Sequence, residues 1–232
     1  MAKKSKRTKE IVKIVDKDKV YTAKDAIELL KACPKVKFDQ SVEFALDVNV
    51  DPKKHQIRGT SILPHGTGKK QVVVVLTKGN KEAEAKDAGA DFVGAEDIVE
   101  KIKGGWTDFT VLIASPDMMR EVGKLGKILG PRNLMPSPKA GTVTAEIGKA
   151  VEEVKKGKIE FKLDKTAVIN TIIGKLGFET DKLVDNLRNL VQAITSNKPA
   201  GAKGVFLKSL SLSSTMGPGL KIDLQSVNVG QG

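Results

Sequence analysis

The sequence predicts an α+β domain of the split β-α-β type with an antiparallel sheet, into which a doubly wound α/β domain is inserted. Both ends contain apolar residues with a period of two, which indicates half-buried strands. The middle alternates continuous apolar runs with amphipathic helical patterns, as in a parallel sheet covered on both faces. We therefore expect one discontinuous domain formed by 1–67 and 159–232 and an inserted domain over 68–158. One continuous three-layer domain is the alternative.

The composition excludes several classes of protein. The chain has 232 residues, of which 40% are hydrophobic, so it is long enough for one large or two ordinary domains. No run approaches the roughly 18 apolar residues of a membrane helix, and the Lys-rich start lacks the apolar core of a secretory signal. The single cysteine, Cys33, excludes an internal disulfide and fits a reducing cytosol. We expect a cytoplasmic protein with no membrane partner.

The charge indicates a polyanionic partner. The net charge is +12, and lysines and arginines that neutralise phosphates gain affinity by releasing counterions. Residues 1–67 carry 15 Lys/Arg against 9 Asp/Glu and residues 159–232 carry 9 against 6, so the two ends are the more basic parts. Aromatic residues are only 4% of the chain, which disfavours a stacking platform for single strands.

The N-terminal part contains a basic arm, a helix and a strand. Met1–Lys9 is polar and basic, and we expect it to be mobile until a partner orders it. Thr22–Lys31 is typical of a helix capped by the Thr22 hydroxyl. Lys37–Val50 contains a strand whose polar face presents Ser41 and Glu43 together.

The middle part alternates strand and helix patterns, as in a parallel sheet covered by helices. Its first strand is a continuous apolar run, as in a strand that is buried on both faces. Two chain crossings, one near Gly66–Lys70 and one near Gly157, would join this part to the ends, and the Gly and Lys residues of both suit a hinge. We expect strands over Gln71–Thr77, Ala90–Val93 and Phe109–Ala114, and helices over Asn80–Ala88, Ala95–Lys103, Glu146–Lys156 and from Pro116.

The C-terminal part reads as two hairpins separated by a helix. Ile159–Leu163 and Ala167–Ile173 predict a hairpin around Asp164, Lys165 and Thr166. Thr180 is the expected cap of a helix that runs to about Thr195. Val205–Leu212 and Leu220–Val227 predict a terminal hairpin.

The turn of the terminal hairpin is the candidate binding element. Ser213–Gly219 offers three hydroxyls, an exposed methionine and glycines whose backbone a ligand can approach closely. It contains no acid, base or metal ligand, so we interpret it as a surface that grips a partner by shape. The alternative is an ordinary hairpin turn.

No pattern indicates catalysis or a cofactor. His55 and His65 are the only histidines and lack metal-ligand spacing. Gly66–Lys70 resembles the end of a phosphate loop but lacks its first glycine and its Ser/Thr, and it precedes a strand. Gly123–Gly126 and Gly174–Gly177 match a Gly-x-x-Gly loop of RNA-binding modules only weakly.

Two alternative functions stay open. One is a nucleotide- or phosphate-binding α/β enzyme domain on a basic arm. The other is a DNA-binding repressor, although no helix-turn-helix is apparent.

Four stretches resemble the bacterial large-subunit ribosomal protein L-one family, which binds the mobile stalk. Lys124–Pro136 is similar to the family signature, and Thr215–Pro218 resembles its RNA-binding loop. Lys37–Glu43 and Arg58–Gly66 are similar as well, so the resemblance covers essentially the whole chain.

The resemblance implies a non-enzymatic, cofactor-free constituent of the large ribosomal subunit. Its discontinuous domain would bind the large-subunit rRNA at the stalk near the exit site, and the protein would assist release of deacylated exit-site tRNA. It would also repress translation of its own operon by binding the mRNA, and it would be a monomer off the ribosome. These partners follow from the resemblance alone.

The resemblance also assigns the RNA contacts. Hydroxyls of Ser214 and Thr215 would bond to 2′-hydroxyls or phosphates. Glu43 would accept from a base edge or 2′-hydroxyl and so confer specificity, and the alternative is that it is a solvated charge on the sheet face. Members often carry Gly where this chain has Ala167. Arg132 and Lys139 either meet RNA or form a solvated loop. The implied contacts are Lys37, Phe38, Ser41, Glu43, Asp164, Lys165, Thr166, Ser213, Ser214, Thr215, Met216, Gly217 and Pro218.

Overall fold

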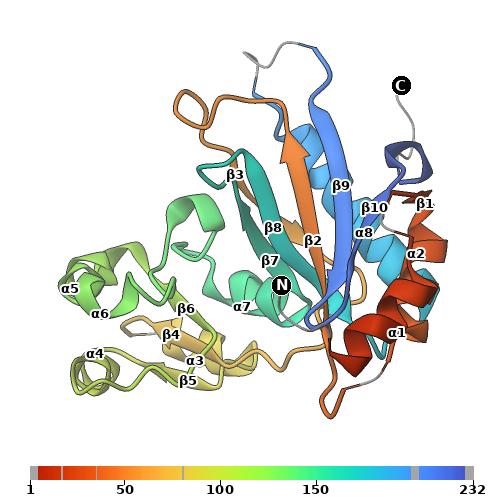
Figure 1. Ribbon diagram of the computed structural model, residues 1–232. Coiled ribbons are helices and arrows are strands. Elements are labelled where there is room, and N and C mark those ends of the chain that lie inside the picture. The colour runs from red at the N-terminus through yellow and green to blue at the C-terminus, as the bar shows by residue number, and fades with distance from the viewer. Residues whose placement is uncertain (1–4, 17, 35, 80, 200–203, 228–232) are drawn as a thin grey trace. The chain divides into compact units, whose positions relative to one another are not determined.

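The protein has a mixed α/β structure that divides into two compact units, each described by itself below. The computed structural model describes residues 5–16, 18–34, 36–79, 81–199 and 204–227 (Figure 1). We name the units by their order along the chain. The outer unit holds both chain ends and comprises 1–68 and 160–232, and the inner unit is the stretch between them, 69–159.

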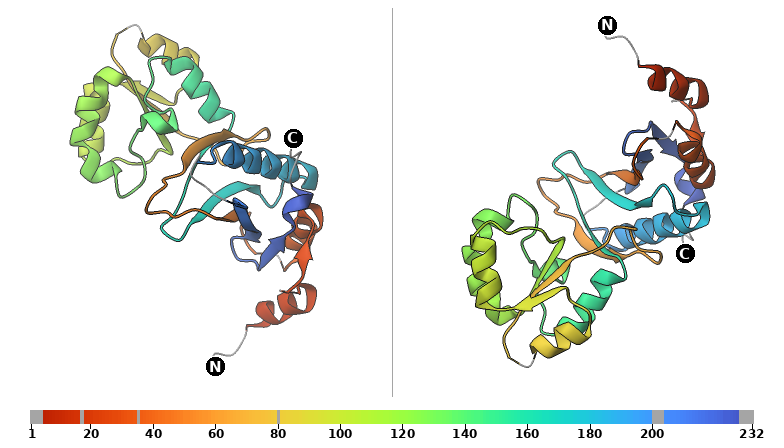
Figure 2. Two further views of the ribbon diagram at one scale, coloured as in Figure 1. Left: turned by 90° about the horizontal axis from the view of Figure 1, so that it is seen from above. Right: turned by 90° about the horizontal axis from the view of Figure 1, so that it is seen from below.

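The outer unit is built on a five-stranded sheet with the order β1-β10-β9-β2-β8. Strand β2 is antiparallel to both of its neighbours, and β1 is parallel to β10. Figure 2 shows N-terminal and C-terminal segments lying side by side in this unit. The strands are β1 (Val20–Tyr21), β2 (Ser41–Val48), β8 (Val168–Lys175), β9 (Leu207–Ser214) and β10 (Gly219–Ile222).

Two helices cover one face of this sheet. α2 (Ala23–Ala32) and α8 (Thr180–Ser196) contact each other and the strands β8, β9 and β10. Strand β2 turns Val42, Phe44, Leu46 and Val48 toward them, and each of these side chains is at most 1% exposed. The residues between them, Glu43 among them, lie on the opposite face and are exposed or half-buried. The predicted alternation of β2 is therefore confirmed, and it divides the sheet into a core face and an open face.

The expected hairpin of 159–173 is wrong in its pairing. β7 (Lys158–Lys162) pairs with β3 (Arg58–Ile62) in a separate two-stranded sheet, whereas β8 pairs with β2. One isolated bridge, Leu163 to Ile169, joins the ends of β7 and β8. β3 contacts α8, and Phe161 of β7 is 1% exposed. Burial against α8 thus outweighs local pairing along the hairpin.

Two predictions at helix ends also need correction. α1 (Lys6–Ile14) begins inside the supposed mobile arm, because the Ser5 side chain accepts a hydrogen bond from the Thr8 amide and caps the helix. Residues 1–4 lie outside the described part. Thr180 is the first residue of α8 rather than its cap, and its hydroxyl instead accepts from Lys31 Nζ at 3.1 Å. The predicted Thr22 cap of α2 is confirmed.

The inner unit has a parallel sheet with the order β5-β4-β6, buried on both faces. Val74 and Leu76 of β4 pack in one apolar cluster with residues of α4, α5 and α6, and Val73 and Val75 pack in another with α3 and α7. The elements are β4 (Val73–Leu76), α3 (Lys81–Asp87), β5 (Phe92–Gly94), α4 (Glu96–Lys103), β6 (Val111–Ala114), α5 (Met119–Lys124), α6 (Gly126–Leu129) and α7 (Ile147–Lys155).

The helix expected from Pro116 is broken into pieces. A 3-10 turn, Pro116–Met118, precedes α5, and the chain breaks again at Leu125 before α6. Glycines at 123 and 126 flank the second break, and glycine lowers helix propensity by about 1 kcal/mol relative to alanine.

The turn between β7 and β8 forms where the sequence predicts it, with one strained residue. Asp164 N donates to Val168 O at 2.9 Å, and Ala167 N donates to Asp164 O at 3.1 Å. Ala167 has a φ of 63°, in the left-handed region that disfavours residues with a Cβ.

Ala167→Gly is expected to stabilise the protein. Relief of about 1–2 kcal/mol of backbone strain is partly offset by the greater freedom of glycine in the unfolded chain, so the free energy of unfolding should rise by about 0.5–1 kcal/mol. Urea unfolding measures this. Ala193→Gly within α8 is the control and should lower stability by about 1 kcal/mol. A loss of stability in Ala167→Gly as well would contradict the strain.

Candidate nucleic-acid interface

The open face of the five-stranded sheet is rich in hydroxyl and amide groups. Along β2, Glu43 lies opposite Ser213, Ala45 opposite Ser211 and Asp47 opposite Ser209. On the other side of β2, Asn170 of β8 lies opposite Ala45. Such groups both donate and accept hydrogen bonds, so this face suits a polar ligand with a ribose-phosphate backbone.

The predicted binding loop is docked on the start of β2. Thr215 N donates to Ser41 O at 3.1 Å, and Ser41 N donates to Thr215 Oγ1 at 3.1 Å. Thr215 Oγ1 in turn donates to Ser41 O at 3.3 Å. Met216 N donates to Gln40 Oε1 at 3.0 Å, and Gln40 is only 4% exposed. The structure therefore joins Ser41 and Thr215, which are 174 residues apart, into one polar site.

The two hydroxyls in this loop have different roles from those expected. A threonine hydroxyl has one donor and two acceptor positions. Thr215 Oγ1 uses the donor and one acceptor position on Ser41, so it can accept one hydrogen bond from a ligand but cannot donate one. Ser214 is 3% exposed, and its hydroxyl is enclosed without a partner. Ser214 O also accepts from Gly217 N at 2.8 Å, so Ser214 offers a ligand almost no free surface, against the expectation that its hydroxyl binds RNA.

Lys175 belongs to the same site, and sequence reasoning missed it. It lies opposite Ser41 in the sheet, and its Nζ contacts Ser41 Oγ and Asp39 O at 3.3 Å each. The only sequence signal was the weak Gly174–Gly177 match. Lys37 is exposed in the bend before β2, and Phe38 beside it is 54% exposed. Met216 is 56% exposed, so the site combines cations with apolar surface.

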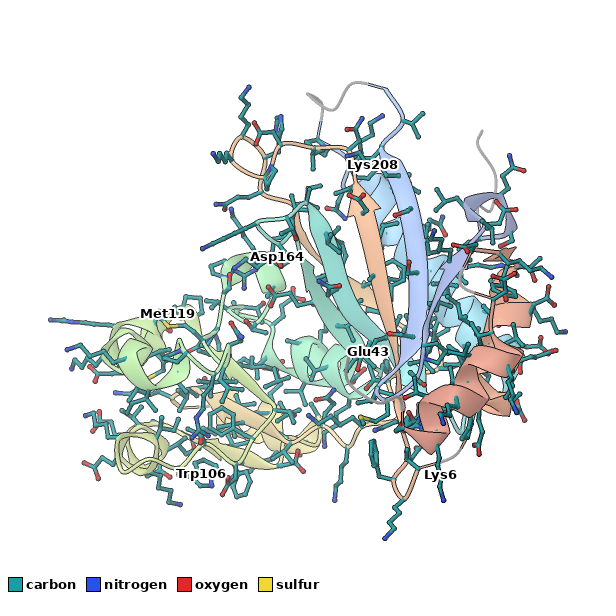
Figure 3. All side chains as sticks on the ribbon, in the orientation of Figure 1. Lys6, Glu43, Trp106, Met119, Asp164 and Lys208 are labelled. Atoms are coloured by element: carbon teal, nitrogen blue, oxygen red, sulfur yellow. The ribbon has the colours of Figure 1, made fainter. Side chains whose placement is uncertain are left out.

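The predicted site residues fall at two ends of the sheet. Ser41 pairs with Lys175 at one end of the β2–β8 ladder, and Asp47 pairs with Val168 at the other. The exposed turn Asp164–Thr166 is separated from Val168 only by Ala167, so it lies about 20 Å from Ser41 at roughly 3.3 Å per residue along β2. Figure 3 labels Glu43 and Asp164 toward these opposite ends. The structure does not bring the turn and the loop together.

The inner unit holds the two residues whose role the sequence leaves open. Arg132 and Lys139 are both exposed, and Arg132 Nη1 donates to the Thr107 hydroxyl. Asn133, next to Arg132, has a φ of 55°. This bond links the loop of Arg132 to the segment between α4 and β6.

Metal-ligating side chains are not clustered in the described residues. No group of three or more His, Cys, Asp or Glu there could hold a metal ion. Cys33 is buried in the outer unit, and burial raises the pKa of its thiol, which keeps the thiol neutral and unreactive at pH 7. Among the same residues, no helix is long and apolar enough to cross a membrane.

Close contact between Gly217 and Ser214 makes a testable pair. A Cβ on Gly217 would lie 2.1 Å from Ser214 Oγ. Gly217→Ala should therefore lower the free energy of unfolding by about 1–3 kcal/mol through overpacking. Ser214→Ala removes the obstructing hydroxyl, so Gly217→Ala should cost at most about half as much in that background. Urea unfolding of the original chain, the two single variants and the double variant measures the coupling energy between the two positions. An equal loss of unfolding free energy from Gly217→Ala in both backgrounds would contradict the geometry.

Comparison with known proteins identifies the family of the chain. Residues 29–218 match the model of the Ribosomal protein L1p/L10e family. The chain is 57% identical to the large ribosomal subunit protein uL1 of Protochlamydia amoebophila, over 97% of this chain and 96% of the relative. It is 53% identical to the protein of the same name from Chlamydia caviae, over 98% of this chain and 99% of the relative. These relatives are named as ribosomal proteins and not as enzymes. The chain therefore belongs to the Ribosomal protein L1p/L10e family.

Proposed function

We propose that this protein binds the large-subunit rRNA directly at the mobile stalk near the exit site of the cytoplasmic ribosome. The discontinuous α+β domain of 1–67 and 159–232 is the RNA-binding domain, and the doubly wound α/β domain of 68–158 is inserted into it. Membership of a ribosomal protein family, the basic ends of the chain and the open polar face of the sheet support the proposal.

The docking of Thr215 on Ser41 carries the proposal. The paired backbone and hydroxyl bonds fix the loop before any ligand arrives, so binding costs little conformational entropy. Structured RNA is recognised mostly by shape and by its 2′-hydroxyls, and a rigid loop with one free acceptor on Thr215 suits such a ligand. Lys37 and Lys175 beside the loop supply the phosphate contacts.

Glu43 supplies specificity at the same end of the sheet. It is exposed on the open face opposite Ser213. A carboxylate repels phosphates but accepts hydrogen bonds from a 2′-hydroxyl or a base amine, so it selects the groove edge of the RNA over its backbone. Asp164, Lys165 and Thr166 contact the RNA at the far end of the sheet, so the bound RNA runs along the strands for about 20 Å.

The same surface serves the regulatory function that the resemblance implies. We propose that the operon mRNA offers a mimic of the stalk site, so mRNA and rRNA cannot bind at once and free protein represses its own translation. On the ribosome the protein contacts exit-site tRNA and assists its release. Off the ribosome it is a monomer.

Replacement of Thr215 tests the loop. Thr215→Val keeps the shape but removes the hydroxyl, which leaves the Ser41 amide without its partner. Affinity for a stalk rRNA fragment should fall by about 1–3 kcal/mol. Thr215→Ser, the matched control, should stay within about threefold of the original chain. Filter binding at fixed salt measures both, and unchanged affinity in Thr215→Val would remove the loop from the interface.

Competition tests the shared surface. A leader fragment of the operon mRNA should displace the stalk fragment completely, with an apparent inhibition constant equal to its own dissociation constant. Thr215→Val should weaken both RNAs by the same factor within about threefold. A ternary complex of protein, rRNA and mRNA would show that the two RNAs use different surfaces.

A further inference from the structure

We propose that a groove beside the docked loop takes up one unstacked base of the bound RNA. The groove has a volume of about 370 Å³ and lies wholly within the outer unit, where Lys31, Phe38, Asp39, Gln40 and Leu176 line it. It adjoins the loop, because Gln40 also accepts the hydrogen bond from Met216 N. The inference rests on the proposed function and names a subsite within it.

Gln40 provides an unpartnered polar group in this groove. The residue is 96% buried, its Oε1 is held by Met216 N and its main-chain oxygen by Leu176 N at 2.8 Å. The bond from Met216 fixes which way the amide is turned, so Nε2 is the free end. No described residue accepts a hydrogen bond from Nε2, and this nitrogen is not among the enclosed unpartnered atoms. Nε2 is therefore a donor that opens into the groove and can bond to an acceptor on a ligand, while the rest of the side chain is held in place.

The remaining lining favours a base over a phosphate. Phe38 is 54% exposed, and its ring offers a surface on which a base can stack. The Asp39 carboxylate repels a phosphate but accepts from a base amine. Lys31 Nζ is held by Phe178 O at 2.5 Å and Thr180 Oγ1 at 3.1 Å, more tightly than Lys175 Nζ by its two contacts at 3.3 Å, so Lys31 is the less available of the two for an anion. A base could therefore stack on Phe38, donate from an amine to Asp39 and accept from Gln40 Nε2 through a carbonyl.

The neighbouring cations fit this arrangement. Lys37 precedes Phe38, and Lys175 Nζ contacts Asp39 O at 3.3 Å from outside the lining of the groove. Both can hold the phosphates on either side of a base that leaves the stack. Unpaired bases in loops and bulges are the sites at which RNA is read by sequence, so the groove would add base selectivity to recognition by shape.

Pairwise replacement in protein and RNA tests the inference. The full-length protein is titrated with the stalk fragment, either intact or with one unpaired nucleotide at a time made abasic. At one position, loss of the base should weaken binding about tenfold. Phe38→Leu should weaken binding of intact RNA by about the same factor and should then be insensitive to the abasic change at that position.

Two further variants sharpen the result. Phe92→Leu makes the same change at a 45% exposed phenylalanine of the inner unit, and here the abasic loss should be unchanged. Gln40→Glu keeps an acceptor for Met216 N but removes the donor, so it should also lose sensitivity to the abasic position. Two results would overturn the base site alone, provided that the intact stalk fragment binds. In one, the affinity losses from Phe38→Leu and from the abasic change multiply as independent effects. In the other, no abasic position weakens binding. Failure of the original chain to bind the fragment would instead overturn the proposed function.

Discussion

Hydrogen bonding along both edges of strand β2 is the constraint on which the outer unit depends. Its partners β8 and β9 come more than 120 residues later, so the ladder joins the two ends of the chain into one sheet. A shift of one residue would send Val42, Phe44 and Leu46 to solvent and Glu43 into the core, which strongly fixes the register. The positions of the helices, the open face and the binding loop follow from this register.

The binding loop extends that ladder by other means. After β9 ends at Ser214, the Thr215 hydroxyl takes the bond from Ser41 N that a strand carbonyl would otherwise accept, and Gln40 does the same for Met216 N. Side chains thus replace backbone acceptors where the chain must turn. The loop presents its outer surface without leaving its own amides unpaired, and under the proposed function this rigid surface would recognise RNA by its shape.

Local patterns predicted the elements of this chain better than their partners. The alternation of β2, the Thr22 cap and the apolar run of β4 each indicate their structure within a few residues, because local burial and capping decide them. The pairing of β7 with β3 and the contact of Lys175 with Ser41 depend on residues far away in sequence. The sequence did not indicate that Gln40 is buried, because a polar residue before a strand is expected to be exposed unless its hydrogen-bond partners are known.

Amide hydrogen exchange tests most directly whether the loop is already docked on β2 in the free protein. Thr215 N bonds to Ser41 O and Met216 N to Gln40 Oε1, so both amides should exchange slowly without RNA, at rates comparable with those of β9. Addition of the stalk fragment should change them little. Exchange of both amides at the rate of an unfolded peptide, followed by protection only when RNA binds, would contradict the account.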